Sequence, residues 1–309
     1  MTKKKLLIIF NPRAGRNENR PDVNYIRKTL EGHDFDVDVK LTVCKGDAEE
    51  LAYIYAKKYD VLTVCGGDGT LSEAIKGVVR SGSDVPVGYI PTGSTNDLAS
   101  TVGIPTDVKK AAELIASGNV NTYDSASFNS GGFSYIACFG PGTHISYSTP
   151  QRMKNALGYS AYTLNGFLFN VIPTVLEAKP KHIKIEYDGK TLDDYFYFGA
   201  VSNALSVARM FNFDRNKVCL NDGKYEIMLV RKIHGIAGLI DTVFKLLRGD
   251  LDCDSLLFLT ASEVKFEFDL PVNWITDGEF GGKIRKADIN VKKHAVRLLC
   301  PDSELFIKQ

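Results

Sequence analysis

The stretch Val61-Leu-Thr-Val-Cys-Gly-Gly-Asp-Gly-Thr-Leu-Ser72 decides the fold of the first part of the chain. Its apolar beginning is typical of a buried strand, and a helix-like run follows the glycine-rich turn at once. The glycines allow the backbone to approach a ligand closely, and a helix N-terminus offers free N–H groups to a phosphate. The acid in the turn, Asp68, cannot clamp a phosphate and suits Mg²⁺ or its bound water. The stretch therefore predicts a nucleotide-phosphate site.

The same strand-then-helix pattern runs through residues 1–125. Continuous or alternating apolar runs at 6–10, 35–43, 61–65 and 85–90 indicate strands, and helical spacing follows them. Repeated units of this kind predict an N-terminal, doubly wound, mostly parallel, Rossmann-like α/β domain. Ligands of such sheets gather at the carboxyl ends of the strands. The loops after Phe10, Cys65 and Ile90 lie at such ends.

The pattern changes near residue 126, and β-rich segments separated by turn signals continue to about residue 296. They predict a C-terminal antiparallel domain, sandwich-like or barrel-like, that would receive the substrate. Two helical insertions, about 151–177 and about 235–248, interrupt it. The last segment, about 297–309, is apolar enough to pack back on the first domain. We therefore expect two domains of different classes, α/β and β.

Composition excludes several classes of protein. The 309 residues include 38 basic and 37 acidic side chains, so the formal net charge is +1 and no global field attracts nucleic acid. The six cysteines are scattered without a CxxC pair, which favours free thiols in a reducing cytoplasm. No run approaches the roughly 20 apolar residues of a membrane span. Any contact with lipid is therefore expected to be peripheral.

Three loops at the predicted sheet edge carry residue types suited to phosphate. They are Asn11-Pro12-Arg13-Ala14-Gly15, Gly66–Thr70 and Pro91-Thr-Gly-Ser-Thr-Asn-Asp-Leu-Ala99. Each also has a purely structural interpretation, such as an ordinary turn for the first loop and helix capping for Asn96 and Asp97 in the third. Because all three fall on one edge of one sheet, a shared ligand explains them better than coincidence.

In this order and spacing, NPRAG, GGDGTLSE and PTGSTNDLA resemble the diacylglycerol kinase catalytic domain, and more narrowly the soluble bacterial lipid kinases of that family. Asn221-Asp222-Gly223 and Asp277-Gly278-Glu279 match as well, and the resemblance covers nearly the whole chain. It implies an ATP-dependent lipid kinase that transfers the γ-phosphoryl group of Mg-ATP to a hydroxyl of diacylglycerol or a related lipid. The nucleotide would lie in the cleft between the two domains.

The resemblance also implies roles for individual residues. Asp277 matches the general base, Glu279 is close enough to contest that role, and Asp68 completes the catalytic set. Asp68, Asp97 and Asp124 would order the water around the Mg²⁺ of Mg-ATP. The structural interpretation of Asp277 is a turn acid before glycine. The nucleotide would be lined by Asn11, Pro12, Arg13, Ala14, Gly15, Thr42, Gly66, Gly67, Asp68, Gly69, Thr70, Leu71, Ser72, Ser94 and Asn96.

The chain departs from the family at a second, structural Mg²⁺ site. The expected acids fall on Val218 and Asn221, and neither supplies the carboxylate that a hard cation prefers. Asp222 is then the remaining ligand, with Asp214 a distant candidate. We predict that this second metal site is not intact.

Two other functions stay open. An NAD kinase shares a GGDGT loop, although PTGSTNDLA and the late Asp-Gly-Glu favour the lipid kinase. A lipid- or nucleotide-binding protein without turnover is favoured only by the altered 208–221 region. The lipid kinase interpretation implies a substrate presented at a membrane surface, a cytoplasmic protein peripheral to the inner face of the membrane, and no nucleic acid partner. It leaves a homodimer open, and the sequence does not select the acceptor lipid.

Overall fold

The computed structural model describes residues 3–15, 22–141, 179–207, 211–212, 218–233 and 254–308, with single residues at 235, 238, 242 and 245. The chain forms two compact units. Unit 1 comprises Met1–Ser125, Cys219–Asp222 and Lys293–Gln309, and unit 2 comprises Ala126–Val218 and Gly223–Lys292. The predicted insertion 151–177, Asp214 and nearly all of the insertion 235–248 lie outside the described residues.

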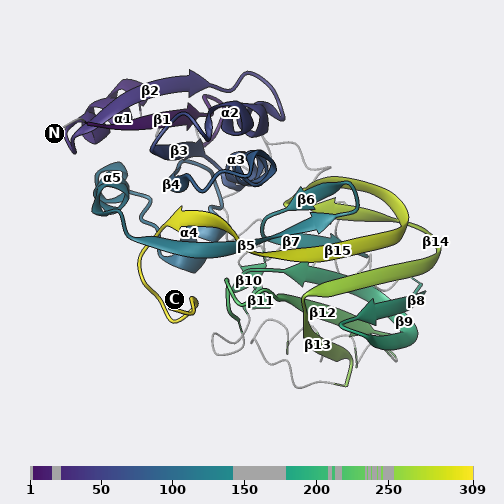
Figure 1. The fold of residues 1–309 in the computed structure, drawn as a ribbon. Helices are drawn as coiled ribbons and strands as arrows, with labels where there is room; N and C mark the ends of the chain where they lie inside the picture. The colour runs from purple at the N-terminus through teal and green to yellow at the C-terminus, as the bar shows by residue number, and fades with distance from the viewer. Residues whose placement is uncertain are drawn as a thin grey trace. The chain divides into compact units, whose positions relative to one another are not determined.

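Unit 1 contains the predicted parallel sheet (Figure 1). Its strands are β1 (Lys4–Phe10), β2 (Phe35–Leu41), β3 (Val61–Gly66) and β4 (Pro86–Pro91). They lie in the order β4-β3-β1-β2, and all three pairings are parallel. The end of β15 (Glu279–Leu299) adds a parallel neighbour to β4, where Arg297 pairs with Pro86. The C-terminal part of the chain thus extends the sheet of unit 1.

Helices cover both faces of this sheet (Figure 1). They are α1 (Val23–Glu31), α2 (Asp47–Tyr55), α3 (Asp68–Ser81), α4 (Asp97–Val102) and α5 (Val108–Ser117). Leu6, Ile8 and Phe10 of β1 pack in one cluster with α1 and α5. Leu7 and Ile9 alternate with them and are also fully buried, on the face where α2 and α3 pack together. Burial on both faces explains why β1 is continuously apolar.

Unit 2 is antiparallel, as predicted. Its strands are β6 (Gly131–Phe133), β7 (Ile136–Phe139), β8 (Lys181–Tyr187), β9 (Lys190–Ser202), β12 (Tyr225–Arg231), β13 (Leu256–Ala261), β14 (Glu263–Thr276) and the first part of β15. A short pair, β10 (Ser206–Val207) and β11 (Phe211–Asn212), stands apart from that sheet, and β5 (Val120–Phe128) has residues in both units. Both β7 and β8 pair with β9 and with β14, so the sheet bends around one core.

Aromatic side chains fill that core. Trp274 is fully buried, and its ring lies 4.9 Å from the ring of Phe139 and 5.1 Å from that of Phe128. Phe266 and Phe268 meet Trp274 edge-on. Tilted and edge-on contacts of this kind add to the burial of apolar area. The core therefore holds the strands that carry the Asp277 turn in a fixed register.

No helix among the described residues is both long and apolar enough to span a membrane.

Candidate active site

The loops that follow the parallel strands of unit 1 lie side by side. The backbone N–H of Asn11 donates to the carbonyl of Cys65 at 2.8 Å, and that of Thr42 donates to Phe10 at 3.0 Å. The N–H of Thr92 donates to Gly66 at 2.8 Å. Each bond joins the first residue beyond one strand to the end of its neighbour. The three predicted loops and the segment after β2 therefore share one edge of the sheet.

Asn11 and Gly15 tie the first loop to the other two. The Asn11 Nδ2 donates to Thr70 Oγ1 at 2.8 Å, and its Oδ1 accepts from the N–H of Arg13 at 2.9 Å. Gly15 has a φ of 79°, and a Cβ at this position would lie 2.3 Å from the carbonyl oxygen of Thr92. Only glycine combines that backbone conformation with such a close approach. The first loop is thus held against α3 and the third loop.

The second and third loops meet through their glycines. A Cβ on Gly93 would lie 2.5 Å from the Cα of Gly67 and 2.7 Å from the Asn96 Oδ1. The side chain of Asn96, at a φ of 52°, accepts from the N–H of Gly93 and donates to its carbonyl, both at 3.0 Å. Asn96 occupies the N-cap position of α4, but its side chain makes no capping hydrogen bond, so the prediction of side-chain capping by Asn96 is wrong. Asn96 braces the loop instead, and Asp97 is the first residue of α4.

Asp68 lies at the junction of these loops. It is the first residue of α3, and its Oδ1 accepts from the N–H of Leu98 in α4 at 3.3 Å. Burial raises the pKa of Asp68 above its ordinary value of 3.8, while backbone N–H groups of residues 96–98 act in the opposite direction. A cation bound nearby would favour the ionised carboxylate. A role for Asp68 at a metal ion stays a prediction.

The raised pKa predicts how stability depends on pH. The folded chain binds the Asp68 proton more tightly than the unfolded chain, so this group's contribution to stability falls as pH rises through the interval above 3.8. Asp68→Asn removes the titration and keeps an acceptor for Leu98. We expect the thermal midpoint of the wild type, measured without nucleotide, to fall relative to that of D68N as the pH rises above about 4. A difference that stays constant over this interval would contradict the assignment.

Two further residues at this edge escaped the sequence analysis. Glu73, on α3, accepts from the N–H of Gly46 at 2.9 Å and so holds the segment after β2. The hydroxyl of Tyr89, on β4, lies 3.2 Å from both the Gly66 carbonyl oxygen and the Asn96 Oδ1. Glu73 is the last residue of the GGDGTLSE motif, and this position in the motif is a signal that could have identified it. Tyr89 sits in an apolar run and is indistinguishable there from a core residue.

Asp124 lies among the residues that bring the C-terminal part of the chain into unit 1. It is fully buried in β5, its Oδ1 accepts from the N–H of His294 at 2.6 Å, and its own N–H donates to the carbonyl of Leu220 at 3.0 Å. Burial raises the pKa of Tyr89 well above its ordinary value, and the charges of Asp68, Cys65 and Asp97 raise it further. The role of all three acids around Mg²⁺ stays a prediction.

The residues around Asn221 do not fit the second metal site. Its Nδ2 donates to Thr122 Oγ1 at 3.2 Å and to the carbonyl of Ile307 at 3.1 Å, and its Oδ1 accepts from the N–H of Ile307 at 2.8 Å. Val218 is apolar and buried. Within the described ranges, no three His, Cys, Asp or Glu side chains form a group that could hold a metal ion. Asn221 fastens the C-terminal segment where the family places a ligand.

Chelation and substitution should separate these two roles of Asn221. We expect removal of divalent cations with EDTA to leave the thermal midpoint of the nucleotide-free protein unchanged. Asn221→Asp places an acceptor opposite the Ile307 carbonyl and should lower the free energy of unfolding by about 1–3 kcal/mol. Differential scanning calorimetry measures both. A thermal midpoint of the wild type that rises when Mg²⁺ alone is added would show that the second metal site binds the ion.

Asp277 lies in unit 2, in the hairpin turn between β14 and β15. Asp277 and Gly278 have φ values of 50° and 83°, as a two-residue type I′ turn requires. The Asp277 carboxylate is buried and accepts from three backbone N–H groups: Ser134 at 2.8 Å, Tyr135 at 3.0 Å and Ile136 at 3.1 Å. Turn geometry and these bonds fix the carboxylate on a rigid support. Glu279, exposed, begins β15.

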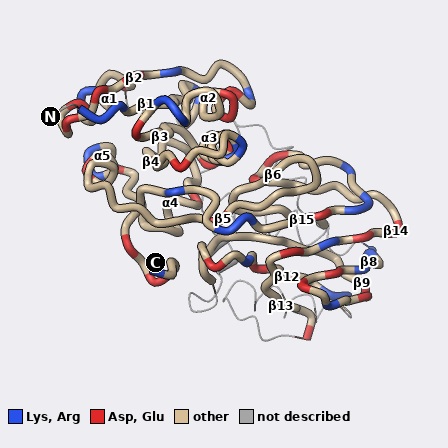
Figure 2. Tube along the Cα trace, in the orientation of Figure 1, with Lys and Arg blue, Asp and Glu red and all other residues tan. Residues whose placement is uncertain are grey.

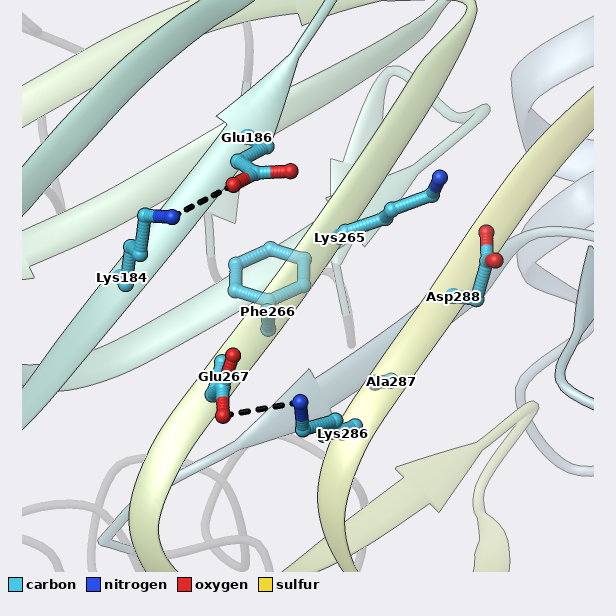
Figure 3. Close-up of a pocket in the computed structure, with 8 residues that line it drawn as sticks. All are labelled: Lys184, Glu186, Lys265, Phe266, Glu267, Lys286, Ala287 and Asp288. Atoms are coloured by element: carbon cyan, nitrogen blue, oxygen red, sulfur yellow. Dashed lines mark hydrogen bonds and ion pairs between the residues drawn. The ribbon is translucent and has the colours of Figure 1, made fainter.

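The hollow on the outer face of unit 2 is a poor candidate for the site (Figure 3). Its charged side chains are Lys184, Glu186, Lys265, Glu267, Lys286 and Asp288. Lys184 pairs with Glu186 at 2.7 Å, and Lys286 pairs with Glu267 at 2.9 Å. Across the strands every lysine faces an acid, and Figure 2 shows both signs interspersed on β14 and β15. Such a self-paired, neutral surface offers little attraction to phosphate.

Comparison with known proteins agrees with the geometry of unit 1. The diacylglycerol kinase catalytic domain matches residues 5–128. A diacylglycerol kinase of Bacillus subtilis is 30% identical over 294 residues, which cover 94% of this chain and 95% of that protein. One from Staphylococcus saprophyticus is 30% identical over 297 residues, with 94% of each chain covered. A crystal structure of a diacylglycerol kinase from Bacillus anthracis matches with a TM-score of 0.77 at 25% identity, covering 97% of this chain and 98% of that one.

The fold and these matches define a lipid kinase, a transferase of phosphoryl groups. The chain belongs to the diacylglycerol kinase family.

Proposed function

We propose that the chain transfers the γ-phosphoryl group of Mg-ATP to the hydroxyl of diacylglycerol or a closely related lipid. The observation that carries this proposal is the N-terminus of α3. Its N-cap, Gly67, provides no side-chain hydrogen bond, so the first N–H groups of the helix are not capped by that residue. A Cβ on Gly69 would meet no atom within 4 Å. A helix end whose N-cap residue contributes no side chain, with open space beside Gly69, suits a phosphate.

A Mg²⁺ ion bound together with ATP would need few carboxylates from the chain, and Asp68 at this edge could supply one. Mg²⁺ usually keeps several waters and takes one or two protein carboxylates beside the phosphates. Asp68, at the helix end, would hold it or its water, with Asp97 and Asp124 in support. When bound, the ion neutralises charge on the transferred phosphoryl group. The chain's own part is to place the phosphates with the backbone of the glycine loops.

Asp277 would accept the proton of the lipid hydroxyl as that oxygen attacks the γ-phosphorus of ATP, and the bond from that phosphorus to ADP breaks so that ADP leaves. Its carboxylate is held through both oxygens by backbone N–H groups, which provides the fixed orientation that proton transfer needs. Glu279 is the alternative acceptor. The position of ATP between the two domains, a lipid presented at the inner face of the membrane, and a homodimer all stay predictions.

Labelled ATP offered with a panel of acceptors tests the proposal. The panel contains diacylglycerol, phosphatidylglycerol and a sphingoid base in detergent micelles, with NAD as the rival acceptor. We expect label on diacylglycerol and none on NAD. Label on NAD alone would identify an NAD kinase. Calorimetric binding of ATP with no labelled product would identify a binding protein without turnover.

A further inference from the structure

We propose that Tyr89 is a positioning residue that sets the spacing of the two glycine-rich loops against which the ATP phosphates bind. This role rests on the proposed function, because it assumes that these loops hold ATP. Tyr89 lies on β4 and is 1% exposed. Its hydroxyl stands 3.2 Å from the carbonyl oxygen of Gly66 in one loop and 3.2 Å from the Asn96 Oδ1 in the other. One hydroxyl therefore bridges both loops.

The acceptors on either side belong to the backbone framework of the site. The Gly66 carbonyl also accepts from the N–H of Thr92, and the Asn96 Oδ1 also accepts from the N–H of Gly93. With Tyr89 and the chain from Thr92 to Gly93, these bonds form a closed ring that links the two loops. A shift of either loop must stretch a bond to the hydroxyl. The ring thus fixes the distance between the two loops.

Tyr89 acts as a donor in this ring. Both neighbouring atoms are oxygens that can only accept, so the hydroxyl must donate, and its single hydrogen is shared between the two acceptors. Burial raises the pKa of Tyr89 well above its ordinary value, and the charges of Asp68, Cys65 and Asp97 act in the same direction. The hydroxyl therefore keeps its proton at any pH at which the enzyme works.

Removal of the hydroxyl should disturb spacing more than folding. In Tyr89→Phe the ring remains buried, and each acceptor keeps its second donor, from Thr92 or Gly93. No buried oxygen is left without a hydrogen bond, which is the condition for a small loss of stability. The two loops keep the bond from Thr92 to Gly66, but they lose the hydroxyl that links the Asn96 side chain to the Gly66 carbonyl. Catalysis by phosphoryl transfer depends on such positioning.

The experiment compares Tyr89→Phe with Tyr59→Phe. Tyr59 is the matched control, because its hydroxyl also donates a hydrogen bond within unit 1, to Asp38 at 2.8 Å on the surface. We expect Y89F to raise the KM for Mg-ATP, and its dissociation constant measured by calorimetry, by about 3- to 10-fold. The KM for the lipid and the thermal midpoint should stay at wild-type values. Y59F should change none of these constants.

The role of Tyr89 and the proposed lipid kinase function can fail independently of each other. An ATP dissociation constant in Y89F equal to that of the wild type would overturn it. A lower thermal midpoint with unchanged ATP affinity would do the same, since it would reduce Tyr89 to a core residue. If the wild type labels no lipid, the proposed function fails, and the comparison of ATP affinities still decides the role of Tyr89.

Discussion

Replacement of Asp277 by asparagine should lower kcat for lipid phosphorylation by about 10²- to 10⁴-fold, the usual contribution of a general base. Asparagine is nearly isosteric with aspartate and tolerates the φ of 50° at this turn position. It retains an oxygen that can accept a hydrogen bond, yet it cannot accept the proton of the lipid hydroxyl. The KM for ATP should not change, because the proposed role of Asp277 is toward the lipid hydroxyl, whereas the glycine loops of unit 1 are proposed to bind the phosphates.

The substitution also has a structural cost that must be measured. The two carboxylate oxygens of Asp277 accept from different groups, Oδ2 from Ser134 and Oδ1 from Tyr135 and Ile136. An asparagine keeps the bonds to one oxygen and loses those to the other, which should cost about 1–3 kcal/mol. Circular dichroism and the thermal midpoint show whether D277N remains folded at the assay temperature.

Asp188 provides a matched control within unit 2. Asp188 and Gly189 form another two-residue hairpin turn, with φ values of 41° and 76°. The Asp188 Oδ1 accepts from the N–H and hydroxyl of Ser262 and from the N–H of Glu263. Because one oxygen accepts all three bonds, Asp188→Asn can keep them and should leave activity unchanged. Equal activity in D277N and D188N would show that Asp277 takes no part in the mechanism. If Glu279→Gln loses activity while D277N keeps it, Glu279 accepts the proton of the lipid hydroxyl.

Replacement of Gly93 by alanine should weaken ATP binding and turnover by about 100-fold, the loss that a misplacement of about 1 Å can produce. The added Cβ would lie 2.5 Å from the Cα of Gly67 and 2.7 Å from the Asn96 Oδ1. Neither neighbour can yield without moving a loop, since one is backbone and the other is bonded to Gly93 itself. The two loops must therefore move apart, and the backbone groups proposed to bind the phosphates move apart with them.

Gly131→Ala is the control for the added methyl group. Its Cβ would meet only the Phe128 carbonyl, at an ordinary 3.7 Å, on strand β6 of unit 2. We expect G131A to bind ATP as the wild type does. ATP affinity measured by calorimetry, together with KM, distinguishes the two variants. Wild-type affinity in G93A would show that the close approach of Gly67 and Gly93 has no part in binding.

Local sequence patterns were sufficient for the architecture of both units. The apolar run of β1 and the helical spacing after it depend on neighbours within about one element, so they predict a buried parallel strand and its helix. Asp-Gly pairs are typical of tight hairpins because both residues readily adopt a positive φ. In the structure φ is positive at both residues of the pairs 188–189 and 277–278. The stretch Gly66–Thr70, interpreted from the sequence as a loop, already contains the start of α3 at Asp68.

Long-range bonds account for what the sequence analysis missed. Asn11 meets Thr70 across 59 positions, and no local period records such a pairing. The chain also returns to unit 1 at Cys219–Asp222, a segment expected to belong to the second domain. Asn221 stands there with hydrogen bonds to Ile307, 86 positions away. Such contacts depend on where the sheet brings distant residues together.

By itself, the sequence determined the strand–turn–helix units, the glycine turns at the strand ends and the family to which the chain belongs, because each is written in neighbouring residues. Only the tertiary structure decided what single side chains do at that edge. It made Asn96 a loop brace and not a cap, and placed the Tyr89 hydroxyl between two loops. The physical reason is that hydrogen bonds form between atoms about 3 Å apart, however far apart their residues lie in the chain.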